Sequence, residues 1–524
     1  MHRNFQIIGF YGNLVSNNHQ QHPSTHGPSV LRFAWIPASR AFMILLSFMG
    51  NALRNPGVVH LYLTLLYLSI ATMVLIPLPV RAAGEIKLAD NATSLIPVPD
   101  KSQKPDSDIS AETFNATAQT TWIVAKHGAF PSPYVGTNSL LPKHEKAYTW
   151  TVSAYIGYRP FANTEIYFDP EMIQSNQFSG LHGLGGFNNN ENQKMGEVTP
   201  TFYRARLFAR QTWNLGGEKI KLDSGANQLA GVVDHDRAVL TLGNVSTPDI
   251  FDNNLYAHDA RTQFLNWALF THIASDFAAD ARGYTWGAAF EYYNGNWAYR
   301  IGQFTQPKES NGLYLEHSIT RHGATQFEIE HSHNLYGHAG KARLFAFRNH
   351  AYMGNFDDAL AYQHVQGDAT PNVANVRRNQ NKIGAGLNFE QSITDSVGIF
   401  GRFGFNNGHT ETSQFSEADR SVSGGVSVKG LPWGREKDTL GLAVANTDIS
   451  EAHRNYLAAG GLGAFIGDGK LPNYRSERLI EACYNFALTS HASLAADFQR
   501  ISNPAYNADR GPVNIGALRL HIEF

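Results

Sequence analysis

Apolar and polar residues alternate in short segments from about residue 118 to the end, and the segments are separated by turns rich in Gly, Asn, Asp and Pro. In residues 148–159, Trp150, Ile156 and Tyr158 share one parity while Ser153 has the other. Successive side chains of a strand point to opposite faces. Trp150 and Tyr158 would lie about 26 Å apart along a strand, and tilt reduces this to about 20 Å, close to the apolar band of an outer-membrane barrel. The pattern predicts a strand with lipid on one side and water on the other.

The same period recurs about sixteen times, which predicts an all-β chain: a transmembrane antiparallel β-barrel spanning residues 118–524. The predicted strands are residues 118–126, 147–158, 163–170, 201–213, 236–243, 283–293, 296–305, 323–333, 340–350, 380–391, 395–407, 420–429, 437–447, 475–489, 491–501 and 513–524.

The connections between these segments alternate between short and long. The tight links at Asn294-Gly295, Thr394 and Ser490 are separated by long ones, the longest being residues 351–379 and 448–474. Outer-membrane barrels have short periplasmic turns and long extracellular loops. Residues 214–234 are an exception, a long link on the short side, for which we expect a periplasmic helix.

The last strand ends the chain on an aromatic residue. Leu518, Leu520 and Phe524 share one parity, and Arg519 and His521 share the other. The first set is interpreted as a lipid-facing stripe and the second as lining the lumen.

The amino-terminal part has the pattern of a targeting segment. Residues 61–76 are apolar, follow a basic residue and precede a small-residue site, so residues 49–82 predict a signal peptide cleaved after Ala82. A single spanning helix is the alternative. Residues 1–48 are a doubtful upstream extension from a misassigned start, and residues 83–117, rich in Pro, Ser, Asp and Lys, predict a flexible leader.

The amino-acid composition excludes some classes of partner and site. The net charge of −2 offers no basic patch for a nucleic-acid partner, and the single Cys483 excludes an intrachain disulfide. Its parity with Glu481 predicts that Cys483 faces water. The spacing of His331, His333 and His338 matches no standard metal motif, so we expect neither a metal site nor a cofactor.

Charged residues on strands indicate where the pore would be lined. Arg204, Arg206 and Arg210 share a parity, and an arginine facing lipid near the midplane costs about 2–4 kcal/mol. All three are therefore expected in the lumen, opposite Glu165 and Asp169 of the preceding strand. Such a ring would bind sugar hydroxyls through charge-assisted hydrogen bonds.

Residues 243–282 are too long and too apolar for a free surface loop, so we expect them to fold into the barrel and form its constriction. The alternative is an extra strand at residues 264–270. The candidate pore-lining residues of this segment are Asp249, Asp252, Arg261 and Trp267. Trp267 could stack on a sugar ring, although packing against the barrel wall is the simpler interpretation.

Glu328 and Glu330 form an acidic ladder with Gln326. Paired carboxylates occur in glycosidases, but acids at every second residue are ordinary for a luminal face. We interpret them as pore-lining and expect no enzyme activity.

Seven segments resemble the carbohydrate-selective porins of the OprB family. They are residues 132–140 (SPYVGTNSL), 165–171 (EIYFDPE), 224–231 (SGANQLAG), 249–254 (DIFDNN), 256–266 (YAHDARTQFLN), 281–287 (ARGYTWG) and 503–512 (NPAYNADRGP). The resemblance covers about residues 120–524. It implies a sixteen-stranded barrel in the bacterial outer membrane with a narrowed pore that favours monosaccharides. The terminal Phe524 resembles the signature recognised by the barrel-assembly machinery.

Several functions stay open on this basis. The leading hypothesis is passive diffusion of glucose-like monosaccharides or polyols, with outer-membrane lipid and lipopolysaccharide as surroundings and a homotrimer as the expected assembly. The alternatives are a general or anion-preferring porin, a quinate or polyol porin, and a secreted carbohydrate-binding β protein.

Overall fold

The structure is a computed structural model that describes residues 111–194, 196–415 and 417–524. The predicted extension (1–48), the signal peptide (49–82) and the leader up to residue 110 lie outside the described residues. The first strand begins at Phe114, so the last residues assigned to the leader belong to the barrel.

Sixteen strands run through the described residues, and each predicted strand corresponds to one of them. They are β1 (Phe114–His127), β2 (Glu145–Phe161), β3 (Thr164–Asn176), β4 (Thr201–Leu222), β5 (Gly231–Val245), β6 (Thr285–Asn294), β7 (Trp297–Thr305), β8 (Gly323–Leu335), β9 (His338–Met353), β10 (Arg378–Ser392), β11 (Val397–Asn406), β12 (Arg420–Gly430), β13 (Arg435–Asp448), β14 (Glu477–Ala487), β15 (Ala492–Ser502) and β16 (Val513–Glu523).

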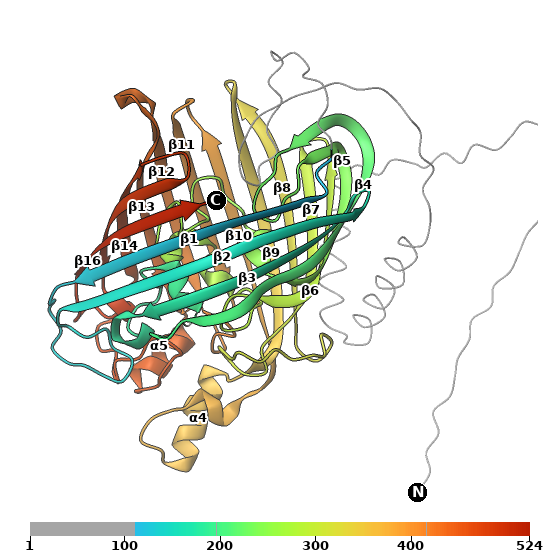
Figure 1. Ribbon diagram of the computed structural model, residues 1–524. Coiled ribbons are helices and arrows are strands. Elements are labelled where there is room, and N and C mark those ends of the chain that lie inside the picture. Colours follow the sequence, from blue (N-terminus) through green and yellow to red (C-terminus); the bar gives the residue numbers. More distant parts are fainter. Residues whose placement is uncertain (1–110, 195, 416) are drawn as a thin grey trace, which may run out of the picture. The chain divides into compact units, whose positions relative to one another are not determined.

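The strands form one closed antiparallel barrel (Figure 1). Each strand pairs with its neighbours in the chain, and β1 pairs with β16 in a register that sets Thr121 opposite His521. Closure gives every strand two partners, which a membrane requires because lipid offers no hydrogen bonds to backbone groups. The predicted fold class is confirmed.

Burial along each strand follows the predicted parity. In β16, Leu518 and Leu520 are exposed on the outer face, while Arg519 and His521 are buried on the inner face. In β2, Trp150 and Tyr158 are exposed and the residues between them alternate in the same way. An apolar outer face and a polar inner face are what a lipid-embedded barrel needs.

The connections also alternate as expected. Seven short links at one end contrast with eight longer loops at the other. The longer loops carry α4 (Phe356–Gln366) and α5 (Glu451–Ala458), which lie at the same end in Figure 1. The remaining helical turns are η1 (Phe178–Leu181), η2 (Asn190–Lys194), η3 (Thr247–Asp249), α3 (Trp267–Phe270), η4 (Ile273–Ser275), η5 (Val373–Val376), η6 (Leu431–Trp433) and η7 (Pro504–Tyr506).

The expected periplasmic helix in residues 214–234 is wrong. β4 continues to Leu222 and β5 begins at Gly231, so most of this stretch is a two-stranded extension of the barrel. Two register shifts after Asn214 and Gly216 interrupt the pairing. They break the regular alternation that would have marked the extension as strand.

None of the helices in the described residues is long and apolar enough to cross a membrane.

Phe524 takes part in the closure of the barrel. Its backbone N–H donates to the carbonyl of Ala118 (2.8 Å), and the N–H of Ala118 donates to the carbonyl of Phe524 (3.1 Å). Deletion of Phe524 removes this last pair, and we expect a smaller folded fraction. The measurement is heat-modifiable migration on a gel. Phe524→Tyr keeps the backbone pair and the ring and is the matched control; equal folded fractions for deletion and control would contradict the prediction.

Candidate pore and its constriction

Residues 246–284, between β5 and β6, lie inside the barrel and are called the inserted segment below. They bond to inward-facing side chains on five strands: Glu328 (β8), Glu390 (β10), Arg402 (β11), Glu481 (β14) and Arg519 (β16). The predicted insertion is therefore present. The alternative of an extra strand at residues 264–270 is wrong, because α3 occupies most of that stretch.

Carboxylates of the barrel wall hold the backbone of the inserted segment. The N–H groups donate from Asp252 to Glu328 (2.7 Å), from Leu255 to Glu390 (2.8 Å), and from Leu265 and Asn266 to Glu481 (2.5 and 3.1 Å). A loop inside a barrel has few backbone partners of its own, and each buried N–H left unpaired costs about 1–3 kcal/mol. The acidic inner faces of these strands therefore serve as docking groups.

Asp252 is an anchor of the inserted segment. Its carboxylate accepts hydrogen bonds from Arg402 Nε (3.0 Å), Thr271 Oγ1 (2.7 Å) and the N–H of His272 (2.6 Å), and the residue is 3 % exposed. Burial opposes ionisation, but Arg402 and His272 outweigh it and hold the pKa of Asp252 well below its usual value. The expectation that Asp252 lines the pore is wrong, since this charge is paired and covered.

Arg261 anchors the segment on the opposite wall. It donates to Glu171 (2.7 Å) on β3, to Glu191 (3.1 Å) in the β3–β4 loop and to Ser153 (3.0 Å) on β2. Glu171 also receives Lys194 Nζ at 2.8 Å. Arg261 is thus buried rather than pore-lining, and Glu171 is a site residue that the sequence prediction missed. The signal was available, because Glu171 continues the parity of the β3 acids one residue beyond the predicted strand end.

The acidic ladder of β8 is neutralised by basic residues on its neighbours. Arg300 Nη1 lies 2.7 Å from Glu328 and 3.3 Å from Glu330. Arg343 and Lys341 approach Glu330 to 2.7 and 3.0 Å. Both glutamates are nearly inaccessible. They therefore belong to a network in the wall behind the inserted segment, and their predicted contact with solute is wrong.

Apolar side chains of the inserted segment form a buried cluster with residues of β11, β13, β14 and β16. Trp267 is 0 % exposed and packs against Phe187, Phe277 and Phe415. It cannot stack on a sugar, so the prediction that Trp267 lines the pore is wrong, and the structure supports the alternative, packing in the interior. Cys483 is buried in the same cluster, and the prediction that it faces water is wrong as well.

Five charged side chains lie together along the β3–β4 wall. Arg206 forms a two-bond pair with Asp249 of the inserted segment (2.6 and 2.7 Å) and lies 3.3 Å from Asp169. Further toward the short turns, Arg210 lies 3.7 Å from Glu165. The side chains of Arg206, Asp249 and Arg210 are 15 %, 37 % and 29 % exposed. Four residues of the predicted ring, Arg206, Arg210, Glu165 and Asp169, therefore lie together at this wall, and Asp249 of the inserted segment joins them.

Arg204 does not belong to this ring. In the β3–β4 ladder Asp169 pairs with Arg206 and Pro170 with Arg204, so Ala205 is an extra residue in a bulge. Arg204 consequently shares the outer face, where its guanidinium lies 5.0 Å from the ring centroid of Trp286. Pro170 lacks an N–H for the ladder, and proline inside a sheet is found at bulges. The predicted inward orientation of Arg204 is wrong for this reason.

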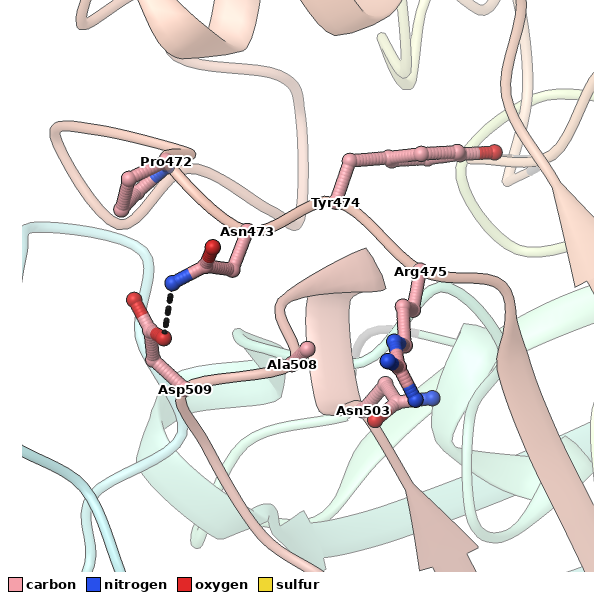
Figure 2. A pocket seen from close by; sticks show the side chains of 7 residues that line it. All are labelled: Pro472, Asn473, Tyr474, Arg475, Asn503, Ala508 and Asp509. Atoms are coloured by element: carbon pink, nitrogen blue, oxygen red, sulfur yellow. Dashed lines mark hydrogen bonds between the residues drawn. The ribbon is translucent and has the colours of Figure 1, made fainter.

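A separate depression of about 620 Å³ lies among the longer loops. Figure 2 shows its lining, in which the Asn473 side chain donates to Asp509 at 2.6 Å. None of the predicted pore residues lines it. The constriction is therefore the place to look for selectivity.

Comparison with known proteins agrees with this architecture. The model of the carbohydrate-selective porin, OprB family, matches residues 162–524. The chain belongs to this family. As a member of it, the protein is an outer-membrane porin for the diffusion of sugars, and family and fold are those of channel proteins.

The barrel fold is shared with a solved porin structure. A high-pH structure of Pseudomonas putida OprB is 16 % identical, with 79 % of this chain and 94 % of that chain covered at a TM-score of 0.59. An anion-selective porin from Comamonas acidovorans is 9 % identical, covering 79 % and 100 %, at a TM-score of 0.43. The DcaP channel of Acinetobacter baumannii is 8 % identical, covering 80 % and 99 %, also at 0.43. No curated protein sequence matches the chain.

Asp252→Ala tests the anchoring of the inserted segment. The change leaves Arg402 buried without its carboxylate, which costs about 3–5 kcal/mol. We expect a lower unfolding temperature in detergent and a higher single-channel conductance in planar bilayers, because the loosened segment narrows the pore less. Asp395→Ala is the control, since the Asp395 side chain is 93 % exposed in a short turn. Wild-type conductance and stability for Asp252→Ala would refute the anchoring role.

Proposed function

We propose that this porin passes glucose-like monosaccharides and polyols of similar size in preference to disaccharides, and that the Arg206–Asp249 pair is the point of selection. The observation that carries the proposal is the position of this pair. Asp249 belongs to the inserted segment and Arg206 to the wall, and they meet at 2.6 Å with both side chains partly exposed. A solute that follows this wall has to pass them.

The chemistry of the pair suits hydroxyl groups. A guanidinium has five N–H donors, of which Arg206 uses three on Asp249 and Asp169, so two are available. Asp249 offers acceptor positions beside them. Donors and charged acceptors at adjacent points can bond neighbouring sugar hydroxyls without a net charge requirement.

The charge balance argues against an anion-preferring pore. Both arginines of the ring are paired with carboxylates, and Arg206 has two of them within 3.3 Å. A filter that prefers anions would need unpaired positive charge facing the passage. Neutral, hydroxyl-rich solutes are therefore the better match.

We further propose that residues 49–82 direct export and are cleaved after Ala82, and that the barrel-assembly machinery recognises the aromatic terminus at Phe524. Lipopolysaccharide and outer-membrane lipid would surround the exposed apolar stripes, and three copies would associate as a homotrimer. These proposals are supported by the sequence patterns and by the outward apolar faces of the strands.

Arg206→Ala and Arg204→Ala form a matched pair on one strand. Arg206→Ala removes three charge-assisted bonds that shape the constriction, and we expect roughly a tenfold loss of discrimination between glucose and a disaccharide, equivalent to about 1.4 kcal/mol. Arg204 lies on the outer face, so the Arg204→Ala porin should discriminate between glucose and a disaccharide as the wild type does. The measurement is swelling of liposomes containing purified protein. Equal effects of the two substitutions, or no swelling above empty liposomes, would contradict the proposal.

A further inference from the structure

The outer face of five adjacent strands, β14, β15, β16, β1 and β2, is basic at one end. Figure 1 shows β16, β1 and β2 side by side. The even-numbered residues of these strands face outward, as the exposed Trp150 and Leu518 show. Within these strands, all of whose residues the structure describes, no outward residue is acidic, and the charged ones are basic: Lys126, Lys146, Arg478 and Arg500. All four are exposed, and they are called the basic patch below.

The basic patch lies at the end of the barrel with the longer loops. Lys126 and Arg500 are near the ends of their strands, and Lys146 and Arg478 are near the starts of theirs. Lys126 follows the exposed Phe114 by twelve positions on β1, which is about 40 Å along the strand and about 28 Å of membrane depth at a tilt of about 45°. The apolar band of such a barrel is about 25 Å tall. The patch is therefore level with the lipid headgroups.

Two lysines of the basic patch face each other without a counter-charge. Lys126 is directly opposite Lys146 in the β1–β2 ladder, so their Cβ atoms are about 4.5–5.5 Å apart. Like charges in this position destabilise a sheet. Among the described residues neither lysine has a carboxylate partner. An anion bound between the two ammonium groups would replace their repulsion with attraction.

The two arginines form the other part of the basic patch. Arg478 is opposite Ser502, two positions from Arg500, so the arginines are diagonal neighbours about 7–8 Å apart. Arg500 donates one hydrogen bond, to Asn514 (3.1 Å), and a guanidinium has five N–H donors. Most donors of this pair are therefore available to a ligand.

The two parts of the basic patch are about one disaccharide apart. Lys126 is in register with Gly516 on β16, and Arg500 is in register with Asn514 on the same strand. Two strand spacings of about 4.8 Å and an offset of two residues separate Lys126 from Arg500 by about 12 Å. A disaccharide with a phosphate at each end can span this separation.

A phosphorylated lipid matches this surface better than a free anion does. The face continues from the basic patch toward the membrane as an apolar stripe, in which Val124 and Trp122 are 41 % and 55 % exposed directly below Lys126. Phosphates bind Lys and Arg through charge-assisted hydrogen bonds, and acyl chains cover exposed apolar side chains. A free phosphate would use only the first of these two features. The long-loop end of an outer-membrane barrel faces outward, where the lipid is lipopolysaccharide.

We propose that the basic patch is a lipopolysaccharide site, at which Lys126 and Lys146 hold one phosphate of lipid A and Arg478 and Arg500 hold the other. The acyl chains lie on the apolar stripe below. The proposal rests on the proposed lipopolysaccharide surroundings and assigns them a specific contact on this chain. It is independent of the selection of solutes inside the barrel, because all four side chains face away from the lumen.

The test titrates the purified full-length porin in detergent with diphosphoryl lipid A and measures the bound lipid by native mass spectrometry. For the double variant Lys126→Gln/Lys146→Gln we expect a Kd about 25-fold higher, about fivefold for each charge removed at an anionic lipid surface. Lys126→Arg/Lys146→Arg keeps both charges and should bind as the wild type does. Lys437→Gln is the control, because it removes the same charge from an exposed residue at the short-turn end of β13.

The other outcomes each overturn the proposal. An unchanged lipid A Kd in the folded double glutamine variant removes the basic patch as the site. Equal affinity for a phosphate-free analogue or for phosphatidylglycerol removes lipid A as the ligand, and displacement by an equal concentration of inorganic phosphate leaves an ion site only. A change in oligomeric state at unchanged lipid A affinity assigns the face to a second copy of the chain.

Failure of the lipid site is distinguishable from failure of the proposed function. Swelling of phospholipid liposomes without lipid A measures the discrimination between glucose and a disaccharide, and the lysine variants should discriminate as the wild type does. Absence of swelling with intact lipid A binding overturns the proposed function and leaves the lipid site. Heat-modifiable migration establishes for each variant that the barrel is folded.

Discussion

The architecture depends on one interaction, the hydrogen bond from an inserted backbone N–H to a carboxylate of the barrel wall. A barrel of sixteen strands satisfies its own backbone, but a segment placed inside it arrives with unpaired donors. The N–H groups donate to three carboxylates on three different strands, those of Glu328, Glu390 and Glu481. The inserted segment can therefore occupy the interior at low cost, and the shape of the passage follows from where it is docked.

Docking gives the interior two regions of different chemistry. Against β13 and β14 the segment buries apolar side chains, including Trp267, and leaves little access. Against β3 and β4 it presents Asp249 to Arg206, with both side chains partly exposed. Charge pairing inside the barrel thus has two uses: covered pairs such as Asp252–Arg402 position the segment, and accessible pairs, in the function we propose, offer hydrogen bonds to a passing solute.

Sequence periodicity was enough to predict the strands, their faces and the side with the long loops, because these depend on residues close in the chain. It also predicted that residues 243–282 enter the barrel. It failed where a contact is non-local or the period breaks. The bulge opposite Pro170 turned Arg204 outward, and the register shifts in β4 concealed the hairpin extension. Whether a buried acid anchors a loop or meets solute, as for Asp252, depends on partners more than a hundred residues away.

The central claim is that water and solute follow the β3–β4 wall, while the region packed against β13 and β14 is filled. Block of single-channel current by a membrane-impermeant thiol reagent tests it most directly, with Arg206→Cys in the passage and Ala443→Cys, at a residue that is 1 % exposed, in the filled region. The account predicts that the reagent reduces the current of Arg206→Cys and leaves Ala443→Cys and the wild type, with its buried Cys483, unchanged. Equal block at both positions would contradict it.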